Sequence, residues 1–319
     1  MKTLNTESLN DRIKFVIDEI QTQEDISIYS LIISQDEFEY SHYFENELHP
    51  HNLRSISKLI VALCFVKILS EGRIRINGEL INLNTRIWPV ISKKVNLVNK
   101  NNLVRLEKIT IEHLFTHTTG YGSELLFSKD MTQIPDTTYL QFLCDEPLIF
   151  EPGQHFLYSN ASAFLLSVYF QETSGQKLID FARDHFFSKM GVESFNWKTY
   201  GEYCAGATGL SLFNKDLHKF GQLLLNNGLW KNKQIISKKW IKYISTSFYC
   251  NLDNRYREDP LGINSYGLFM WICINGDYFI KGKGGHYLLV SPRNNIVISS
   301  VSHTENAEKL AKYLKMIIN

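Results

Sequence analysis

Residues 53–69, L-R-S-I-S-K-L-I-V-A-L-C-F-V-K-I-L, constrain this chain more than any other stretch. From Leu59 to Leu69 every residue except Lys67 is apolar. A helix that is apolar on nearly every face is buried, and this interrupted run is too short to cross a membrane. The sequence therefore predicts a central buried helix with two serines and Lys58 at its start.

Composition sets the class of protein and limits its partners. The 319 residues are 44% hydrophobic and 21% charged, which is typical of a globular protein with one large domain or two smaller ones. The net charge of +1 favours neither a nucleic acid nor a membrane as partner. Nothing in the sequence indicates an oligomeric state.

The N-terminal residues and the cysteines indicate a compartment. Residues 1–20 predict an amphipathic helix that carries acids, unlike a signal peptide, so a chain that starts here is expected to be cytoplasmic. The cysteines are odd in number and scattered, which favours reduced, buried thiols over disulfides. They are Cys64, Cys144, Cys204, Cys250 and Cys273.

Strand patterns occur at both ends of the chain and helix patterns lie between them. Near the N-terminus, residues 10–22 predict a helix and residues 26–34 and 37–44 predict strands. Near the C-terminus, Asn275-Gly276 and residues 292–294 are hairpin turns, and a last helix covers 305–318. The expected helices between them are 109–120, 161–172, 178–189, 214–226 and 237–244, after an irregular stretch from 73 to 108.

This order predicts an α/β protein of the α+β type. An antiparallel sheet would form from both chain ends, with helices on its faces and a mostly helical domain inserted between. We expect residues 1–319 to form one catalytic unit. Its sheet subdomain would comprise residues 1–50 and 262–319, and its helical subdomain about 73–245.

Ser55 and Lys58 form an S-x-x-K motif. On a helix, residues three apart share a face within side-chain reach. A serine hydroxyl is a weak nucleophile until a neighbour removes its proton, and a lysine does this when burial lowers its pKa. A helix N-terminus also favours a substrate oxyanion. The alternative is an ordinary solvated helix face.

A second group of polar residues lies in E-P-G-Q-H-F-L-Y-S-N, residues 151–160. Pro152-Gly153 forces a turn, so Tyr158 and Asn160 precede the next helix. A phenol there can transfer a proton, and an amide can hold a polar group of a substrate. The alternatives are that Asn160 only caps the helix and that Tyr158 only packs.

A third motif, I-K-G-K-G-G-H-Y-L-L-V, spans residues 280–290. Glycines inside a strand indicate that another group approaches the backbone closely. The alternative is a β-bulge at the start of the strand.

These motifs, in this order, resemble the penicillin-recognising serine hydrolases, and most closely the class C β-lactamase-like branch. The similarity covers about residues 25–303 and includes I-T-I-E-H-L-F-T-H-T-T-G, the segment 209–228 and G-G-H-Y-L-L-V-S-P. It implies that Ser55 is acylated, that Lys58 accepts its proton and that Tyr158 exchanges protons with the leaving group. It also implies that Asn160 contacts the substrate.

The resemblance implies an oxyanion hole formed by the backbone N–H groups of Ser55 and Lys283. Gly282-Lys283-Gly284 would then replace the family's K-T-G or H-T-G triplet, although no threonine lies between residues 280 and 287. Lys281, Lys283 or His286 is expected to supply the cation of that motif. The missing threonine favours an ester or amide over a β-lactam or a D-alanyl peptide as substrate.

The resemblance therefore implies a serine hydrolase that acts on a small ester, amide or peptide-like molecule and needs no cofactor. Acyl transfer, β-lactam or D-alanyl-peptide cleavage, and a non-catalytic acyl-binding module of the same fold stay open. His113 and His117 are four apart but lack a third ligand, so we expect no metal site, and H-T-T-G is expected to be structural. Loops 121–150 and 245–265 would shape the pocket with Tyr121, Phe127, Tyr249 and Tyr256.

Overall fold

The architecture is organised around one antiparallel sheet built from both chain ends. The computed structural model describes residues 8–76, 78–127 and 131–319. The sheet has seven strands in the order β12-β13-β14-β15-β16-β1-β2. These are β1 (Ile28–Gln35), β2 (Phe38–Tyr43), β12 (Ile263–Tyr266), β13 (Trp271–Cys273), β14 (Tyr278–Gly282), β15 (His286–Ser291) and β16 (Ile296–Ser302). Strands near the two ends of the chain therefore pair directly, β1 with β16.

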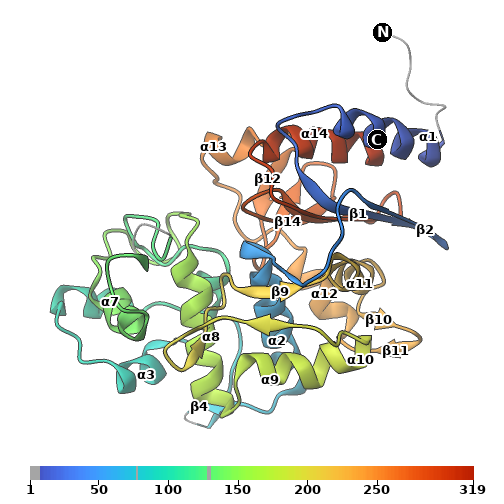
Figure 1. Cartoon of the computed structure of the whole chain (residues 1–319). Helices are drawn as coiled ribbons and strands as arrows, with labels where there is room; N and C mark the ends of the chain where they lie inside the picture. The colour runs from blue at the N-terminus through green and yellow to red at the C-terminus, as the bar shows by residue number, and fades with distance from the viewer. Residues whose placement is uncertain (1–7, 77, 128–130) are drawn as a thin grey trace.

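Helices cover both faces of this sheet (Figure 1). Helices α1 (Leu9–Gln21) and α14 (Ala307–Ile318) pack together on one face, and α11 (Asn214–Leu225) packs on the other. A Cβ atom at Gly221 of α11 would lie 2.4 Å from Val297 Cγ1, so only glycine allows this close approach. Because both faces are covered, β16 is buried along its whole length.

The helical part of the molecule lies beside the sheet (Figure 1). Helix α2 (Ser57–Glu71) lies next to this part, and the other helices outside the sheet layer include α7 (Tyr139–Asp145), α8 (Asn160–Ser174), α9 (Leu178–Ala182) and α12 (Lys238–Ile244). Further short helices are α3 (Trp88–Ile91), α4 (Leu103–Leu106), α5 (Ile111–Phe115) and α10 (Ser188–Met190), and α13 (Asn254–Arg257) lies against β12 of the sheet. The π-helical turn η5 (Arg183–Phe187) joins α9 to α10, and 3₁₀ turns lie at η1 (Arg54–Ile56), η2 (Ser92–Lys94), η3 (Lys100–Asn102) and η4 (Asp136–Thr138).

Short strands complete the structure. They form a three-stranded sheet in the order β3-β9-β6 and three two-stranded ribbons. Their bounds are β3 (His51–Asn52), β4 (Arg75–Ile76), β5 (Glu79–Leu80), β6 (Asn196–Trp197), β7 (Thr199–Tyr200), β8 (Tyr203–Cys204), β9 (Leu210–Leu212), β10 (Leu229–Trp230) and β11 (Lys233–Gln234).

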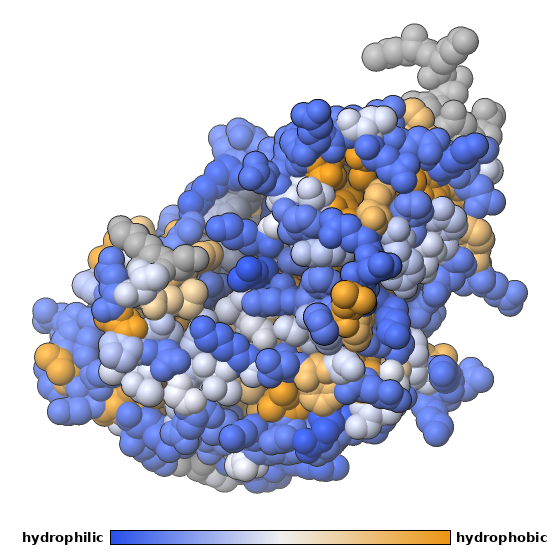
Figure 2. Space-filling model, viewed as in Figure 1, coloured by the Kyte–Doolittle hydropathy of each residue, from blue (hydrophilic) through white to orange (hydrophobic). Residues whose placement is uncertain are grey.

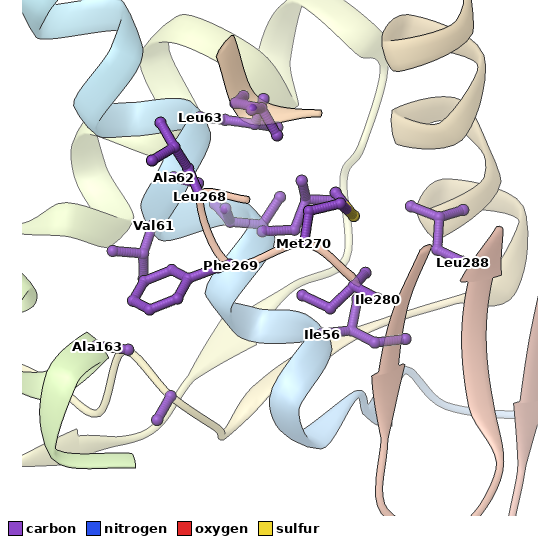
Figure 3. Packing of buried hydrophobic residues seen from close by; sticks show 14 of the residues in the cluster. Ile56, Val61, Ala62, Leu63, Ala163, Leu268, Phe269, Met270, Ile280 and Leu288 are labelled. Atoms are coloured by element: carbon purple, nitrogen blue, oxygen red, sulfur yellow. The ribbon is translucent and has the colours of Figure 1, made fainter. Parts of the chain in front are cut away.

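Helix α2 is the predicted buried helix, and it lies between the sheet and the helical part (Figure 1). All its residues from Ser57 to Val66 are buried. Gly72 ends it in the left-handed conformation, with φ of +60°, as the sequence predicts. Figure 3 shows Val61, Ala62 and Leu63 of α2 beside side chains from distant segments. These side chains include Ala163, Leu268, Phe269, Met270 and Ile280.

The expected hairpins and terminal helices are confirmed, but two elements differ from the prediction. The apolar run before Asn275 is not one strand, because residues 267–270 turn and bury Phe269 against Phe115. A Cβ atom at Gly267 would lie 2.5 Å from Ile244 O, so the chain bends at a glycine packed against backbone. The helix predicted to end at Gly120 ends at Phe115, because His117 has a positive φ of 53°.

Hydrophilic residues cover most of the face shown in Figure 2, and hydrophobic residues form separate patches. No helix in the described ranges is long and apolar enough to cross a membrane. The expectation that every cysteine is buried is wrong for Cys250, which is exposed on the surface segment before α13. The other four are buried, and all five are free thiols.

Because Gly282 has no side chain, the end of β14 packs closely against the turn that carries Ser55. A Cβ atom there would lie 2.4 Å from Leu53 O, a backbone atom whose residue is held by a hydrogen bond from Leu53 N to Leu210 O. We predict that Gly282→Ala lowers the free energy of unfolding by about 2 kcal/mol, because neither backbone can retreat.

Urea denaturation measures this effect, with Gly122→Ala as the matched control. The added Cβ atom at Gly122 would lie 2.5 Å from Ile149 Cδ1, but Ile149 is 57% exposed and can rotate away. The control should therefore change stability by less than about 0.5 kcal/mol. Equal effects of the two substitutions would contradict the role assigned to Gly282.

Candidate active site

Ser55 lies in a tight turn immediately before α2. The sequence prediction placed it on the helix itself, but it belongs to the 3₁₀ turn η1, after Arg54 with a positive φ of 52°. Asn52 Oδ1 accepts hydrogen bonds from Arg54 N at 3.0 Å and from Gly209 N at 3.2 Å. Ser57 Oγ donates to Arg54 O at 2.7 Å. These side chains hold a backbone conformation that non-glycine residues rarely adopt.

Lys58 is completely buried and points back at Ser55. Its Nζ donates hydrogen bonds to Ser55 Oγ at 3.1 Å, Asn160 Oδ1 at 2.8 Å and Ala207 O at 3.3 Å. Within the described residues, Lys58 forms no ion pair with a carboxylate. Burial therefore lowers the pKa of Lys58 from its ordinary value to about 7.

Tyr158 lies over Lys58, at the end of the loop that leads into α8. The Lys58 Nζ atom is 4.7 Å from the centroid of the Tyr158 ring. The ring also stacks on Trp271, with centroids 5.7 Å apart and planes at 17°. Burial raises the pKa of the Tyr158 hydroxyl, while a hydrogen bond with the Ser55 side chain acts in the opposite direction. Ser55, Lys58 and Tyr158 therefore meet in one place, as the sequence predicts.

Asn160 is the first residue of α8, and both groups of its side chain are engaged within the protein. Its Oδ1 accepts from Lys58, and its Nδ2 donates to Leu126 O at 2.9 Å. The helix cap is Ser159, whose Oγ accepts from Ala161 N at 3.1 Å. The alternative that Asn160 only caps the helix is therefore wrong, and its predicted contact with a substrate stays a prediction.

The H-T-T-G segment supports the loop that carries Tyr158. His117 O accepts from Leu157 N at 2.9 Å, and Thr118 O accepts from Gly153 N at 2.7 Å. The buried His117 ring lies 4.6 Å from the Tyr158 ring, and burial, followed by the charge of Lys58, lowers its pKa well below the ordinary value. The neutral imidazole packs against the site without competing with Lys58 for a proton.

Residues of the third motif lie in two places: some border the site, and others are buried in the protein interior. Gly282, Lys283 and Gly284 border the same cavity as Ser55. His286 is buried in β15, and its Nδ1 accepts a hydrogen bond from Ser302 N at 3.3 Å. Burial lowers the pKa of His286 to about 3, so this side chain is uncharged at neutral pH. His286 pairs with Gly282 across β14 and β15, but it is not among the residues that border the cavity.

A cavity of about 610 Å³ opens beside Ser55. Phe127 and Tyr256 border it, as expected for the two loops. Tyr121 is buried and donates to Leu143 O at 2.7 Å, and Tyr249 donates to Gln154 O at 2.9 Å. The full lining is Ser55, Phe127, Tyr158, Tyr256, Trp271, Lys281, Gly282, Lys283, Gly284, Tyr287, Thr304, Glu305, Ala307 and Glu308.

Several of these partners have no signal in the sequence. Ala207 contributes only its backbone carbonyl oxygen, which accepts from Lys58. Trp271 lies on β13 and stacks on Tyr158, which lies on a loop distant in the sequence. Asn52 is a short-range exception, because an asparagine two residues before a strained position is a recognisable turn signal. Chemically, the arrangement combines a hydroxyl, an amine that is partly neutral at pH 7 and a phenol beside an open cavity.

Comparison with known proteins identifies the family. The protein-family profile described as Beta-lactamase matches residues 40–318. The chain belongs to the beta-lactamase family. The match includes all the predicted site residues, so the resemblance noted in the sequence is confirmed at the level of the family.

Solved structures of several other proteins share the fold. Simvastatin synthase (LovD) from Aspergillus terreus has a TM-score of 0.74 at 13% identity, over 98% of each chain. The penicillin binding protein from Bacillus halodurans has a TM-score of 0.70 at 15% identity, over 96% of this chain and 98% of that one. EstCE1, a hydrolase with promiscuous acyltransferase activity, has a TM-score of 0.68 at 13% identity, over 98% of each chain. At these identities the similarity shows the fold alone.

The environment of Lys58 makes a prediction that needs no substrate. NMR of lysine labelled at Cε and Nζ should show Lys58 with a pKa of about 7, far below the ordinary value for a lysine side chain. Asn160→Leu should lower the pKa of Lys58 further, because it removes an acceptor that stabilises the ammonium form.

Ser162→Ala is the matched control, since Ser162 lies on the same helix and its buried Oγ has no hydrogen-bond partner among the described residues. The control should leave the pKa of Lys58 unchanged. A Lys58 pKa above about 9 in the wild-type protein would contradict the assigned environment.

Proposed function

We propose that this protein is a serine hydrolase that cleaves an ester or amide through an acyl-Ser55 intermediate. One observation carries the proposal: the buried Lys58, which has no carboxylate partner among the described residues, donates to Ser55 Oγ at 3.1 Å. A lysine buried only for structural reasons would be expected to have a carboxylate partner, because a buried charge without one lowers the stability of the protein. Its pKa near 7 suits a group that must accept and release a proton at neutral pH.

Acylation begins with Lys58 in its neutral form. Ser55 Oγ attacks the carbonyl carbon of the substrate, and the Ser55 proton passes to Lys58 Nζ. The backbone N–H groups of Ser55 and Lys283 are proposed to stabilise the oxyanion, because Gly282 brings the end of β14 against the Ser55 turn. The bond to the leaving group then breaks and leaves the acyl group on Ser55.

Tyr158 is proposed to protonate the leaving group. Its raised pKa keeps the phenol protonated at neutral pH, and Lys58 lies beneath its ring to return the proton. In deacylation, water attacks the acyl carbon, the water proton leaves through the same pair, and Ser55 regains its proton. Attack by an alcohol or amine in place of water would make the protein an acyltransferase by the same steps.

The second candidate function is cleavage of β-lactams or D-alanyl peptides. The observation in its favour is that two lysines, Lys281 and Lys283, border the cavity and could meet a substrate carboxylate. Against it, Lys281 is already paired with Asp259. An ester or amide without a carboxylate therefore fits the site better.

Labelling with a serine-directed phosphonate tests the nucleophile. Intact-protein mass spectrometry should show one adduct on Ser55, with turnover of p-nitrophenyl acetate. Ser55→Ala should abolish both, and Lys58→Ala should lower turnover by about 10³-fold or more while the protein stays folded. The control Ser70→Ala, at an exposed serine that donates to Lys67 O, should retain both. Folded wild-type protein without an adduct or turnover would support the non-catalytic binding module.

The pH dependence of kcat/KM tests the role of Lys58. With a neutral ester, kcat/KM should rise as the pH increases through about 7 and then level off, because only neutral Lys58 accepts the Ser55 proton. The buried imidazoles of His117 and His286 have lowered pKa values and stay neutral through this range. A profile that is flat from about pH 5.5 to 9 would exclude Lys58 as the base.

A further inference from the structure

We infer that Asp259 sets the substrate class of this site, which selects uncharged or cationic acyl donors and disfavours those that carry a carboxylate. The inference rests on the proposed function, because it concerns which esters or amides reach Ser55. Asp259 lies outside the motifs that carry the family resemblance. Its effect follows from the charges around the cavity.

Asp259 neutralises the lysine that would otherwise attract an anion. Its Oδ2 forms an ion pair with Lys281 Nζ, and its side chain is only 5% exposed. Lys281 borders the cavity together with Ser55, and its Nζ is 6.0 Å from the centroid of the Trp271 ring. Because the pair is partly shielded from water, each charge offsets much of the field of the other inside the cavity.

The remaining charges on the cavity wall are one lysine and two glutamates, so they add no net positive charge. Lys283 is exposed, and it forms no ion pair within the described residues. Glu305, just before α14, and Glu308, in its first turn, also border the cavity. The cavity lining thus carries two lysines and two glutamates, and Asp259 adds a further acid beside Lys281.

The negative charges act on the wall of the cavity. Tyr287 borders the cavity, and the pKa of its hydroxyl is raised first by burial and then by the charges of Asp259 and Glu308. The rest of the wall is largely aromatic, from Phe127, Tyr158, Tyr256 and Trp271. Such a wall favours apolar groups, and its rings and acids also favour a quaternary ammonium over a carboxylate.

Substitution of Asp259 by asparagine removes the negative charge of this side chain but keeps the oxygen atom that accepts a hydrogen bond in the turn. Asp259 Oδ1 accepts a hydrogen bond from Leu261 N at 2.9 Å, and an asparagine Oδ1 retains that acceptor. Asp259→Asn therefore removes one negative charge beside Lys281 and keeps the turn. Lys281→Gln removes the opposite charge, and the double variant restores the original balance.

The test compares three 4-nitrophenyl esters of similar length. They are the valerate (neutral), the glutarate monoester (anionic) and the 4-(trimethylammonio)butanoate (cationic). In Asp259→Asn, the glutarate-to-valerate ratio of kcat/KM should rise roughly tenfold, and the ratio of the cationic ester to the valerate should fall. Lys281→Gln should shift both ratios the other way, and the double variant should return them close to the wild-type values.

A ratio cancels changes that affect all esters alike, such as an altered Tyr158 or a less stable protein. Asp184→Asn is the charge-matched control, because Asp184 is an exposed acid on η5 paired with Arg183, and it should leave both ratios unchanged. Turnover of the valerate with ratios that Asp259→Asn and Lys281→Gln leave within twofold of wild type would overturn this inference and leave the proposed function standing. Absence of any turnover, with no adduct on Ser55, would overturn both.

Discussion

The desolvation of Lys58 is the interaction on which the rest of the site depends. An amine that met water or a carboxylate would hold its proton at pH 7 and could not take one from a serine. Here three oxygen atoms, from Ser55, Asn160 and Ala207, surround Nζ without bringing a negative charge. The apolar surface of α2 is therefore part of the chemistry, because it keeps water away from the first turn of the helix.

Segments far apart in the sequence supply this environment. The loop before α8 brings Tyr158 and Asn160, the segment before β9 brings Ala207, and β14 closes the site at Gly282. Backbone atoms take part in the contacts that position these segments. Both the sheet and the helical part of the molecule therefore contribute to the site. Two members of the site, Ser55 and Lys58, come from one local motif, and this local part was the easiest to infer.

The sequence was sufficient where local chemistry decides the structure. The apolar run of α2, the Asn275-Gly276 turn and the order of motifs predicted the fold and the meeting of Ser55, Lys58 and Tyr158. The sequence was insufficient where a contact with a residue far away in the chain determines the local structure. The break between β12 and β13 depends on the backbone of Ile244, and the His286 ring is buried where its Nδ1 accepts a hydrogen bond from Ser302 N. The pairing of Lys281 with Asp259 joins residues that no periodic pattern connects.

Under the proposed mechanism, the long-range enclosure of Lys58 also determines when Ser55 can become reactive. The bond to Ala207 O closes a loop of 149 residues, and the contact of Gly282 with Leu53 O joins β14 to the turn before α2. During synthesis, Lys58 thus remains hydrated and protonated until more than two hundred further residues have left the ribosome and packed around it. An incomplete or unfolded chain contains Ser55 but holds it as an ordinary alcohol. Under the proposed mechanism, Ser55 is therefore a nucleophile only in the folded protein.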